Sequence, residues 1–203
     1  MASTETTRTA EEIEAAAFED ELRGGARIAV LDVRSAADVA RWRVDAGATP
    51  FVQACEADIA RDPEGALAAL PTDRPVRVIC ARGNASLRVT RVLVERGLDA
   101  RSVAGGMTAW GLLLTPAEVP LTGSRARVIQ LRREARGCLS YLVLAGGEAL
   151  VVDPAPDPAP YVALAAAEGA RIAHVLDTHV HADHLSGARA LAAATGAPLH
   201  VSE

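Results

Sequence analysis

The chain has 203 residues, which is enough for one large domain or two small ones. Half of the residues are hydrophobic but only 3% are aromatic, so the composition predicts a core of alanine, valine and leucine. The net charge of −5 argues against nucleic-acid binding and against binding to an anionic membrane, because both need a basic face. No uncharged apolar run approaches the roughly 20 residues that span a bilayer, so no membrane partner is expected.

Strands and helices alternate in the first half of the chain, which predicts a parallel α/β sheet flanked by helices. We expect a disordered tail at 1–9 and one domain at 10–118, with residues 45–62 showing no clear period. The predicted elements are a helix at 10–23, a strand at 27–33, a helix at 36–43, a short helix at 65–70, a strand at 76–79, a helix at 87–97 and a strand at 100–103.

The hydrophobic period changes in the second half of the chain. Pro116, Pro120 and Gly123 predict a linker at 119–124 and a second domain at 125–203. The Gly-Gly pair at 146–147 is typical of a hairpin turn. The predicted elements are strands at 125–131, 140–145 and 148–153, a helix at 159–169, a strand at 171–176, a helix at 186–195 and a strand at 198–201.

The loop at 80–86, Cys-Ala-Arg-Gly-Asn-Ala-Ser, joins a predicted strand to a predicted helix. A cysteine placed there meets converging backbone N–H groups and the positive end of the helix dipole, which lower a thiol pKa and can hold a persulfide. Arg82 adds a fixed charge, and Ser86 is expected to cap the helix and add a donor. The alternative is a small core cysteine before an ordinary turn. The predicted persulfide cradle consists of Ala81, Gly83, Asn84, Ala85 and Ser86.

Three cysteines are too few and too scattered for a disulfide framework. A reducing cytoplasm is therefore expected, where Cys80 stays available as a thiolate. Cys55 and Cys138 are assigned no function, because neither lies at a convincing helix N-terminus.

Three segments resemble signatures of the rhodanese family and occur in the family's order. They are Leu-Asp-Val-Arg at 31–34, the cysteine loop at 80–86, and Val-Ala-Gly-Gly-Met-Thr-Ala-Trp at 103–110. The resemblance covers residues from about 8 to 118. It implies a sulfurtransferase that needs no cofactor, takes sulfur from thiosulfate or a persulfide, and passes it to a thiol such as glutathione. Asp32 and Arg34 are expected to support the loop.

The chain departs from the rhodanese pattern at two places. Residues 44–50 read Val-Asp-Ala-Gly-Ala-Thr-Pro where the family has a Gly-His-Ile-Pro-Gly-Ala-like segment, and Ala85 replaces a common arginine. Arg82 is then the main cation of the loop. This weakens the case for thiosulfate as the donor more than the case for Cys80 chemistry.

A dense group of metal-binding residue types follows the strand predicted at 171–176. His179 and His181 share one face of an extended segment and can converge on one ion, while Asp183 and His184 can address a second ion. Imidazole and carboxylate suit zinc, iron or manganese. The alternative is a polar loop with incidental histidines. His174, inside the strand, is interpreted as a core histidine.

This group resembles the His-x-His-x-Asp-His motif of the metallo-β-lactamase superfamily, and the match extends to 137–141, 151–154 and 184–188. It is most similar to the branch of glyoxalase II and persulfide dioxygenases. By this resemblance a dioxygenase holds one Fe(II) with His179, and a glyoxalase holds two metals with all four motif residues. Asp153 is expected either to orient a metal ligand or to act as a turn residue before the prolines.

Residues 125–203 correspond to the first half of an αββα sandwich in that superfamily, without its later ligands. We therefore expect the chain to be a fragment or to be completed by a partner. In this chain Fe(II) or Zn should bind weakly and below one ion per chain. A homo-oligomer could cover the exposed sheet.

The leading function is a sulfurtransferase that works through a Cys80 persulfide, in a fusion associated with sulfide and persulfide metabolism. One alternative is a non-catalytic rhodanese-like scaffold. The other is a metal-dependent persulfide dioxygenase or thioester hydrolase, if the missing half is supplied.

Overall fold

The computed structural model describes residues 11–134, 137–180 and 185–201. The chain divides into two compact units, Met1–Gly111 and Leu112–Glu203. The tail expected at 1–9 lies outside the described residues. Among the described residues, no helix is both long and apolar enough to cross a membrane.

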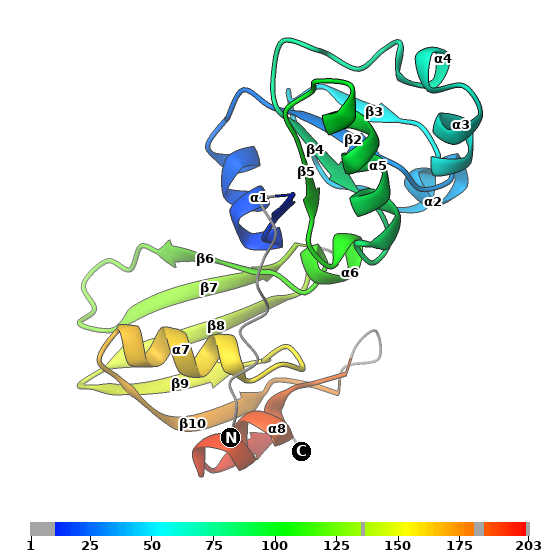
Figure 1. Ribbon diagram of the computed structural model, residues 1–203. Coiled ribbons are helices and arrows are strands. Elements are labelled where there is room, and N and C mark those ends of the chain that lie inside the picture. The colour runs from blue at the N-terminus through cyan, green and yellow to red at the C-terminus, as the bar shows by residue number, and fades with distance from the viewer. Residues whose placement is uncertain (1–10, 135–136, 181–184, 202–203) are drawn as a thin grey trace, which may run out of the picture. The chain divides into compact units, whose positions relative to one another are not determined.

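The first unit contains one parallel sheet with the strand order β1-β5-β4-β2-β3 (Figure 1). Its strands are β1 (Glu12–Ile13), β2 (Ala29–Asp32), β3 (Phe51–Gln53), β4 (Val76–Ile79) and β5 (Ala100–Val103). Because all strands run in the same direction, their carboxyl ends meet at one edge of the sheet, where binding sites of such sheets lie. Cys80 directly follows β4 at this edge.

Six helices accompany this sheet in the described part of the unit. They are α1 (Ala15–Arg23), α2 (Ala36–Arg41), α3 (Glu56–Arg61), α4 (Pro63–Leu67), α5 (Asn84–Glu95) and α6 (Gly106–Trp110). Figure 1 shows α1 on one side of the sheet and α3, α4 and α5 on the other. Every residue of β2 and β4 is buried, as expected of apolar strands that helices cover on both faces. The predicted parallel α/β sheet is confirmed.

Four elements of this unit are missing from the sequence prediction: β1, β3, α3 and the five-residue helix α6. β1 has two residues, too few for a period to show, and it pairs with β5 at the edge of the sheet. β3 and α3 lie within 45–62, where each element spans at most six residues. Short elements like these are defined by their tertiary partners and not by periodicity.

The second unit contains a six-stranded sheet with the order β11-β10-β9-β8-β7-β6. The strands β6 to β9 pair antiparallel, and β9, β10 and β11 pair parallel. The strands are β6 (Leu114–Val119), β7 (Arg127–Arg133), β8 (Leu139–Ala145), β9 (Glu148–Val152), β10 (Arg171–Asp177) and β11 (Leu199–Val201). The predicted hairpin at 146–147 joins β8 to β9.

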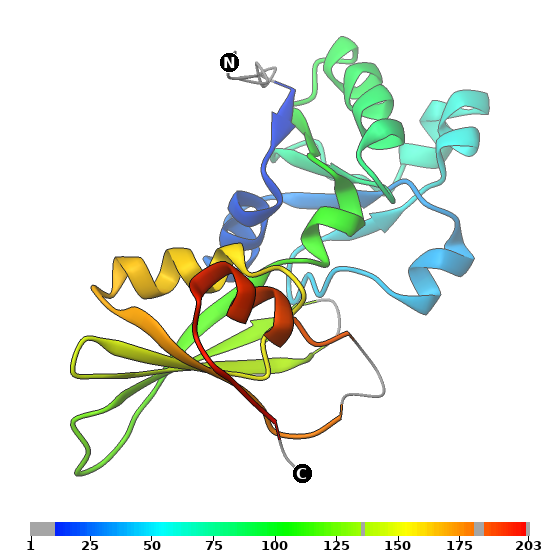
Figure 2. The same cartoon turned by 90° about the horizontal axis from the view of Figure 1, so that it is seen from below.

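Two helices, α7 (Ala159–Ala167) and α8 (Ala188–Thr195), pack on one side of this second sheet (Figure 2). Leu142, Val151 and Val175 point to that side and are fully buried. Tyr141, Val143 and Val152 alternate with them on the opposite face, which neither helix covers, and are only half-buried. This arrangement agrees with the predicted half sandwich.

The boundary between the units lies earlier than 118, where the sequence analysis placed it. Residues 114–119 form β6 and pair along their whole length with β7, so the second unit begins before the linker expected at 119–124. Pro116 suggested a break in the chain. A proline is nevertheless tolerated here because β6 is an edge strand, where a missing N–H need not leave a partner unpaired.

Candidate functional site

Cys80 combines burial with hydrogen bonding to its sulfur. Its residue surface is 4% exposed, and it belongs to the apolar cluster between the sheet and α5. The Sγ atom nevertheless accepts hydrogen bonds from the backbone N–H of Gly83 at 3.1 Å and from the hydroxyl of Ser86 at 3.2 Å. The sulfur therefore faces donors in a site with little competing water.

These donors change the acidity of the thiol. Burial raises the pKa of Cys80, while the Ser86 hydroxyl and the backbone N–H groups of Ser86, Arg82 and Gly83 lower it. The lowering contributions prevail, so the pKa of Cys80 lies below the usual value of a thiol. The geometry favours the thiolate, which is the nucleophilic form.

Ser86 has a different role from the helix cap that the sequence predicted. α5 begins at Asn84, and its N-cap is Gly83, whose φ of +95° suits glycine. Ser86 lies in the first turn, and its hydroxyl is 3.0 Å from the carbonyl oxygen of Gly83. The hydroxyl of Ser102 in β5 donates to the Ser86 oxygen at 2.8 Å, so the Ser86 hydrogen is left for Sγ or the Gly83 carbonyl.

The rhodanese-like segment at 103–110 holds the cysteine loop through its backbone. The N–H of Met107 donates to the carbonyl of Cys80 at 2.8 Å, and the N–H of Thr108 donates to the carbonyl of Ala81 at 3.0 Å. This approach requires a glycine at Gly106, where an added Cβ would lie 2.2 Å from the Cys80 carbonyl oxygen. The two segments therefore form one site, although they are separate in the sequence.

The outer rim of the loop carries positive charge. Ala81, Arg82 and Asn84 are exposed, and Arg82 has no acidic partner among the described residues. Arg88 in α5, which the sequence analysis did not single out, forms a bidentate ion pair with Glu56 at 2.6 and 3.0 Å. That pair raises the pKa of Arg88, and attraction to the Cys80 thiolate raises it further. The periodic pattern of apolar residues in a helix does not indicate an interaction of Arg88 with Glu56 or with Cys80.

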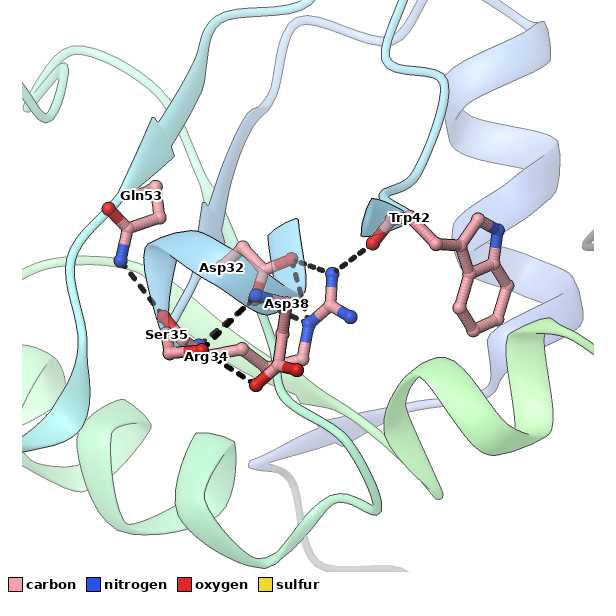
Figure 3. Close-up of polar contacts among 6 residues, drawn as sticks. All are labelled: Asp32, Arg34, Ser35, Asp38, Trp42 and Gln53. Carbon is pink, nitrogen blue, oxygen red and sulfur yellow. Dashed lines mark hydrogen bonds and ion pairs between the residues drawn. The ribbon is translucent and has the colours of Figure 1, made fainter. Parts of the chain in front are cut away.

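Asp32 and Arg34 form a buried ion pair at the end of β2 (Figure 3). The Arg34 guanidinium binds both carboxylate oxygens of Asp32, with a shortest distance of 2.6 Å, and also donates to the carbonyl of Trp42 at 2.8 Å. The amide of Gln53 donates to the Arg34 carbonyl at 2.9 Å. The hydrogen bonds and ion pairs found for these two side chains join β2 to 34–42. None of them reaches the described residues of the loop at 80–86, so the predicted support of that loop stays a prediction.

The histidine cluster is described only in part, because His181, Asp183 and His184 lie outside the described residues. His179 follows β10, and its neighbour Thr178 is bound by Asp153 at the end of β9. The carboxylate of Asp153 accepts from the Thr178 N–H at 2.8 Å and from the Thr178 hydroxyl at 2.7 Å. Asp153 has a φ of +50°, a strained value for a residue with a side chain.

This arrangement selects a tautomer of His179. The Thr178 hydroxyl gives its hydrogen to Asp153, so its oxygen must accept from Nδ1 of His179, which is 2.8 Å away. With the proton on Nδ1, Nε2 is the ring nitrogen that carries the lone pair, which is the form in which a neutral imidazole binds a metal ion. Orientation of a ligand through a carboxylate is typical of metal sites. Among the described residues, no group of three or more His, Cys, Asp or Glu side chains is placed to hold a metal ion. The metal-binding role of His179 and the orienting role of Asp153 therefore stay predictions.

Two other interpretations change with the structure. His174 is exposed and not a core residue; its Nδ1 lies 3.1 Å from Nε2 of His200 on the adjacent strand. The irregular register of β10 explains this, since the strand shifts between Ile172 and His174. Cys55 was expected to lie at no helix N-terminus, but it is the N-cap residue of α3. Its thiol donates a hydrogen bond to the carboxylate of Asp58 at 2.9 Å.

Two family models match the chain in succession. Residues 14–112 match the rhodanese-like domain, and residues 133–203 match the metallo-beta-lactamase superfamily. The chain contains a rhodanese-like domain followed by a metallo-β-lactamase domain. The two resemblances predicted from the sequence are confirmed. The rhodanese-like domain carries Cys80, and the metallo-β-lactamase match includes the histidine cluster.

Individual proteins match each part of the chain. A hydroxyacylglutathione hydrolase from Anaeromyxobacter dehalogenans is 47% identical over 70 residues, which are 34% of this chain and 27% of that enzyme. The chain thus spans about a quarter of the length of this curated relative. A rhodanese-like domain protein from Staphylococcus aureus is 25% identical over 50% of this chain and 91% of its own, with a TM-score of 0.41. A metallo-beta-lactamase from Staphylococcus aureus is 34% identical over 39% of this chain and 24% of its own, with a TM-score of 0.37.

Proposed function

We propose that the rhodanese-like domain is a sulfurtransferase that works through a persulfide on Cys80. The observation that carries this proposal is the buried Sγ of Cys80, which accepts hydrogen bonds from Gly83 and Ser86 and has a lowered pKa. A sulfur anion stabilised by fixed donors is what both the attacking thiolate and the product persulfide require.

The reaction consists of two displacements on sulfur. In the first, the Cys80 thiolate attacks the outer sulfur of a donor such as thiosulfate or an organic persulfide. The new bond joins the two sulfurs, and the bonding pair of the broken S–S bond leaves with sulfite or with a thiolate. In the second, an acceptor thiolate such as glutathione attacks the outer sulfur and releases the Cys80 thiolate. The backbone N–H groups of 81–86 and the Ser86 hydroxyl stabilise the negative sulfur throughout.

The competing proposal is a rhodanese-like scaffold without catalysis. It explains the fold but not the four donors that lower the pKa of a buried cysteine. A purely structural cysteine is stable as a neutral thiol and needs no such donors.

Replacement of Cys80 tests the function directly. The full chain is incubated with thiosulfate or a persulfide, and intact-mass spectrometry should detect one added sulfur atom, which a thiol then removes. Cys80→Ser should lose both the added mass and the transfer of sulfur to cyanide or a thiol. Cys55→Ser serves as the control and should retain both. Transfer by the Cys80→Ser protein would exclude the proposed mechanism.

A second candidate activity belongs to the metallo-β-lactamase domain. The local identity to a hydroxyacylglutathione hydrolase and the orientation of His179 support it. The metallo-β-lactamase domain, together with the rhodanese-like domain, suggests a protein of sulfur metabolism or a glyoxalase II-like hydrolase. His179, His181, Asp183 and His184 would hold zinc or iron, which in a hydrolase supplies an activated water. Asp153 and Thr178 would keep Nε2 of His179 directed at the ion.

Metal binding can be measured apart from activity. Thr178→Val removes the hydroxyl between Asp153 and His179 and should weaken Zn(II) binding about tenfold or more, as judged by competition with a chromogenic chelator. Thr195→Val is the control, because among the described residues the Thr195 hydroxyl bonds only to the backbone of Leu191 and Ala197, at the end of α8. Equal affinities in the two variants would contradict the orienting role of Thr178.

A further inference from the structure

The two guanidinium groups near the Cys80 loop have different electrostatic environments. Arg82 is exposed and has no acidic partner among the described residues. Arg88 is held by Glu56, with Nε 2.6 Å from Oε1 and Nη2 3.0 Å from Oε2. The ion pair joins α3 to α5, and one carboxylate cancels the charge of one of the two arginines.

Arg88 belongs to α5, the helix that begins in the Cys80 loop. It stands one helical turn after Ala85 and two residues after Ser86, which donates to Sγ. Besides the hydrogen bond to Glu56, attraction to the Cys80 thiolate raises the pKa of Arg88. The hydrogen bond to Arg88 also lowers the pKa of Glu56, so Glu56 is ionised at neutral pH. Of these two arginines, Arg88 therefore has its charge compensated by Glu56.

We propose that Glu56, by pairing with Arg88, sets the charge of the sulfur donor that this site accepts. The pair disfavours dianionic donors and favours donors that carry one negative charge. This inference rests on the proposed sulfur transfer and concerns the same site. Glu56 acts through Arg88, so it is a specificity-determining residue and not a catalytic one.

The chemistry explains why donor charge is decisive. Thiosulfate brings two negative charges to a thiolate, and both must be stabilised while the S–S bond breaks and its electron pair leaves with sulfite. Cysteine persulfide carries a net charge of about −1 at neutral pH, and its outer sulfur passes to Cys80 as cysteine leaves as a thiolate. The electrostatic cost of a nearby carboxylate is about twice as large for the dianion, because Coulomb energy scales with the product of the charges.

The experiment compares both donors on the full chain. Glu56→Gln keeps a hydrogen-bonding side chain but removes the charge, so kcat/KM for thiosulfate should rise about fivefold, mainly through KM, and that for cysteine persulfide about twofold. The gain should shrink at high salt, because exposed charges are screened. The matched control is Glu11→Gln, which breaks the similar ion pair of Arg91 on the same helix and should change neither value.

A second variant separates charge from structure. Arg88→Gln should lower kcat/KM for thiosulfate, and the double variant with Glu56→Gln should return the preference between donors to that of the native protein. An unchanged donor preference in Glu56→Gln, or an equal rise in Glu11→Gln, would overturn the proposal. If native protein transfers sulfur from neither donor, the proposed function fails. If it transfers sulfur and Glu56→Gln has no effect, only the role of Glu56 fails.

Discussion

At the scale of single residues, the acidity of Cys80 results from two opposed effects. Burial alone would keep the thiol neutral, because an apolar surrounding destabilises the anion. Hydrogen bonds from Ser86, Arg82 and Gly83 reverse this preference and give a pKa below the usual value. Cys80 is thus both buried in the core and chemically reactive, because the hydrogen bonds to its sulfur outweigh the effect of burial.

Ser86 stabilises the Cys80 thiolate through its side-chain hydroxyl as well as through its backbone N–H. Ser86→Ala removes a donor to the anion, so the thiolate becomes less stable and the pKa of Cys80 should rise. The pH at which Cys80 is half-maximally reactive towards iodoacetamide should therefore move to a higher value, and sulfur transfer should lose more of its rate at acidic pH than at alkaline pH.

Thr90→Val provides the control for this prediction. Thr90 is a second buried hydroxyl on α5, but its Oγ1 has no hydrogen-bond partner among the described residues. The variant should leave the pH profile of Cys80 unchanged. Similar profiles in Ser86→Ala and native protein would mean that the backbone N–H groups alone set the acidity of the thiol.

At the scale of elements, the site depends on two turns that meet at the carboxyl edge of the sheet. The turn after β4 presents Cys80, and the turn after β5 brings the first N–H groups of α6 to the carbonyls of Cys80 and Ala81. Gly105 and Gly106 have φ values of +68° and +56° and allow this close approach. The turn after β5 therefore holds the cysteine loop in its conformation through backbone hydrogen bonds.

Gly106→Ala should disturb the contact between the turn after β5 and the cysteine loop. The new Cβ would lie 2.2 Å from the Cys80 carbonyl oxygen and 2.9 Å from the N–H nitrogens of Arg82 and Gly83. We expect a loss of about 3 kcal/mol in the free energy of unfolding, measured in urea, together with a raised pKa of Cys80.

Gly97→Ala separates steric overlap from backbone strain. Gly97 has a φ of +83°, but an added Cβ meets nothing within 4 Å. This variant should lose only about 1 kcal/mol and leave Cys80 unaffected. Equal effects of the two substitutions would show that the contact between the two turns does not hold the loop.

Element prediction from sequence succeeded where an apolar run or a proline marks the start of an element. The strand at 76–79 follows from its apolar run, and the start of α7 at Ala159 follows from the prolines before it. β6 was missed because Pro116 and Pro120 indicate a break, and only pairing with β7 shows that this segment is an edge strand.

At the scale of the whole molecule, each unit has its own apolar core. Leu31 and Val78 belong to the core under α5, and Leu142 and Val151 belong to the core under α7 and α8. The two clusters have no residue in common. Each unit therefore has the interior that a separate folding unit needs.

Loss of core packing should stay within one unit. Leu142→Ala removes a fully buried side chain and should cost about 2 to 5 kcal/mol, seen by hydrogen exchange in the peptides of the second unit. Alkylation of Cys80 should keep its native rate. Leu31→Ala is the counterpart and should have the reverse effect. Faster alkylation of Cys80 in Leu142→Ala would show that the units unfold together.

The sequence by itself determined the class of both units and the candidate site residues. Alternating apolar strands and helices define a parallel sheet, and Cys80 and His179 follow strands because local order in the sequence places them there. The tertiary structure alone decided which distant segments support the loop. Ser102 donates to Ser86, Gly106 lies against the Cys80 carbonyl and Glu56 pairs with Arg88, and contacts between distant segments leave no periodic pattern in a sequence.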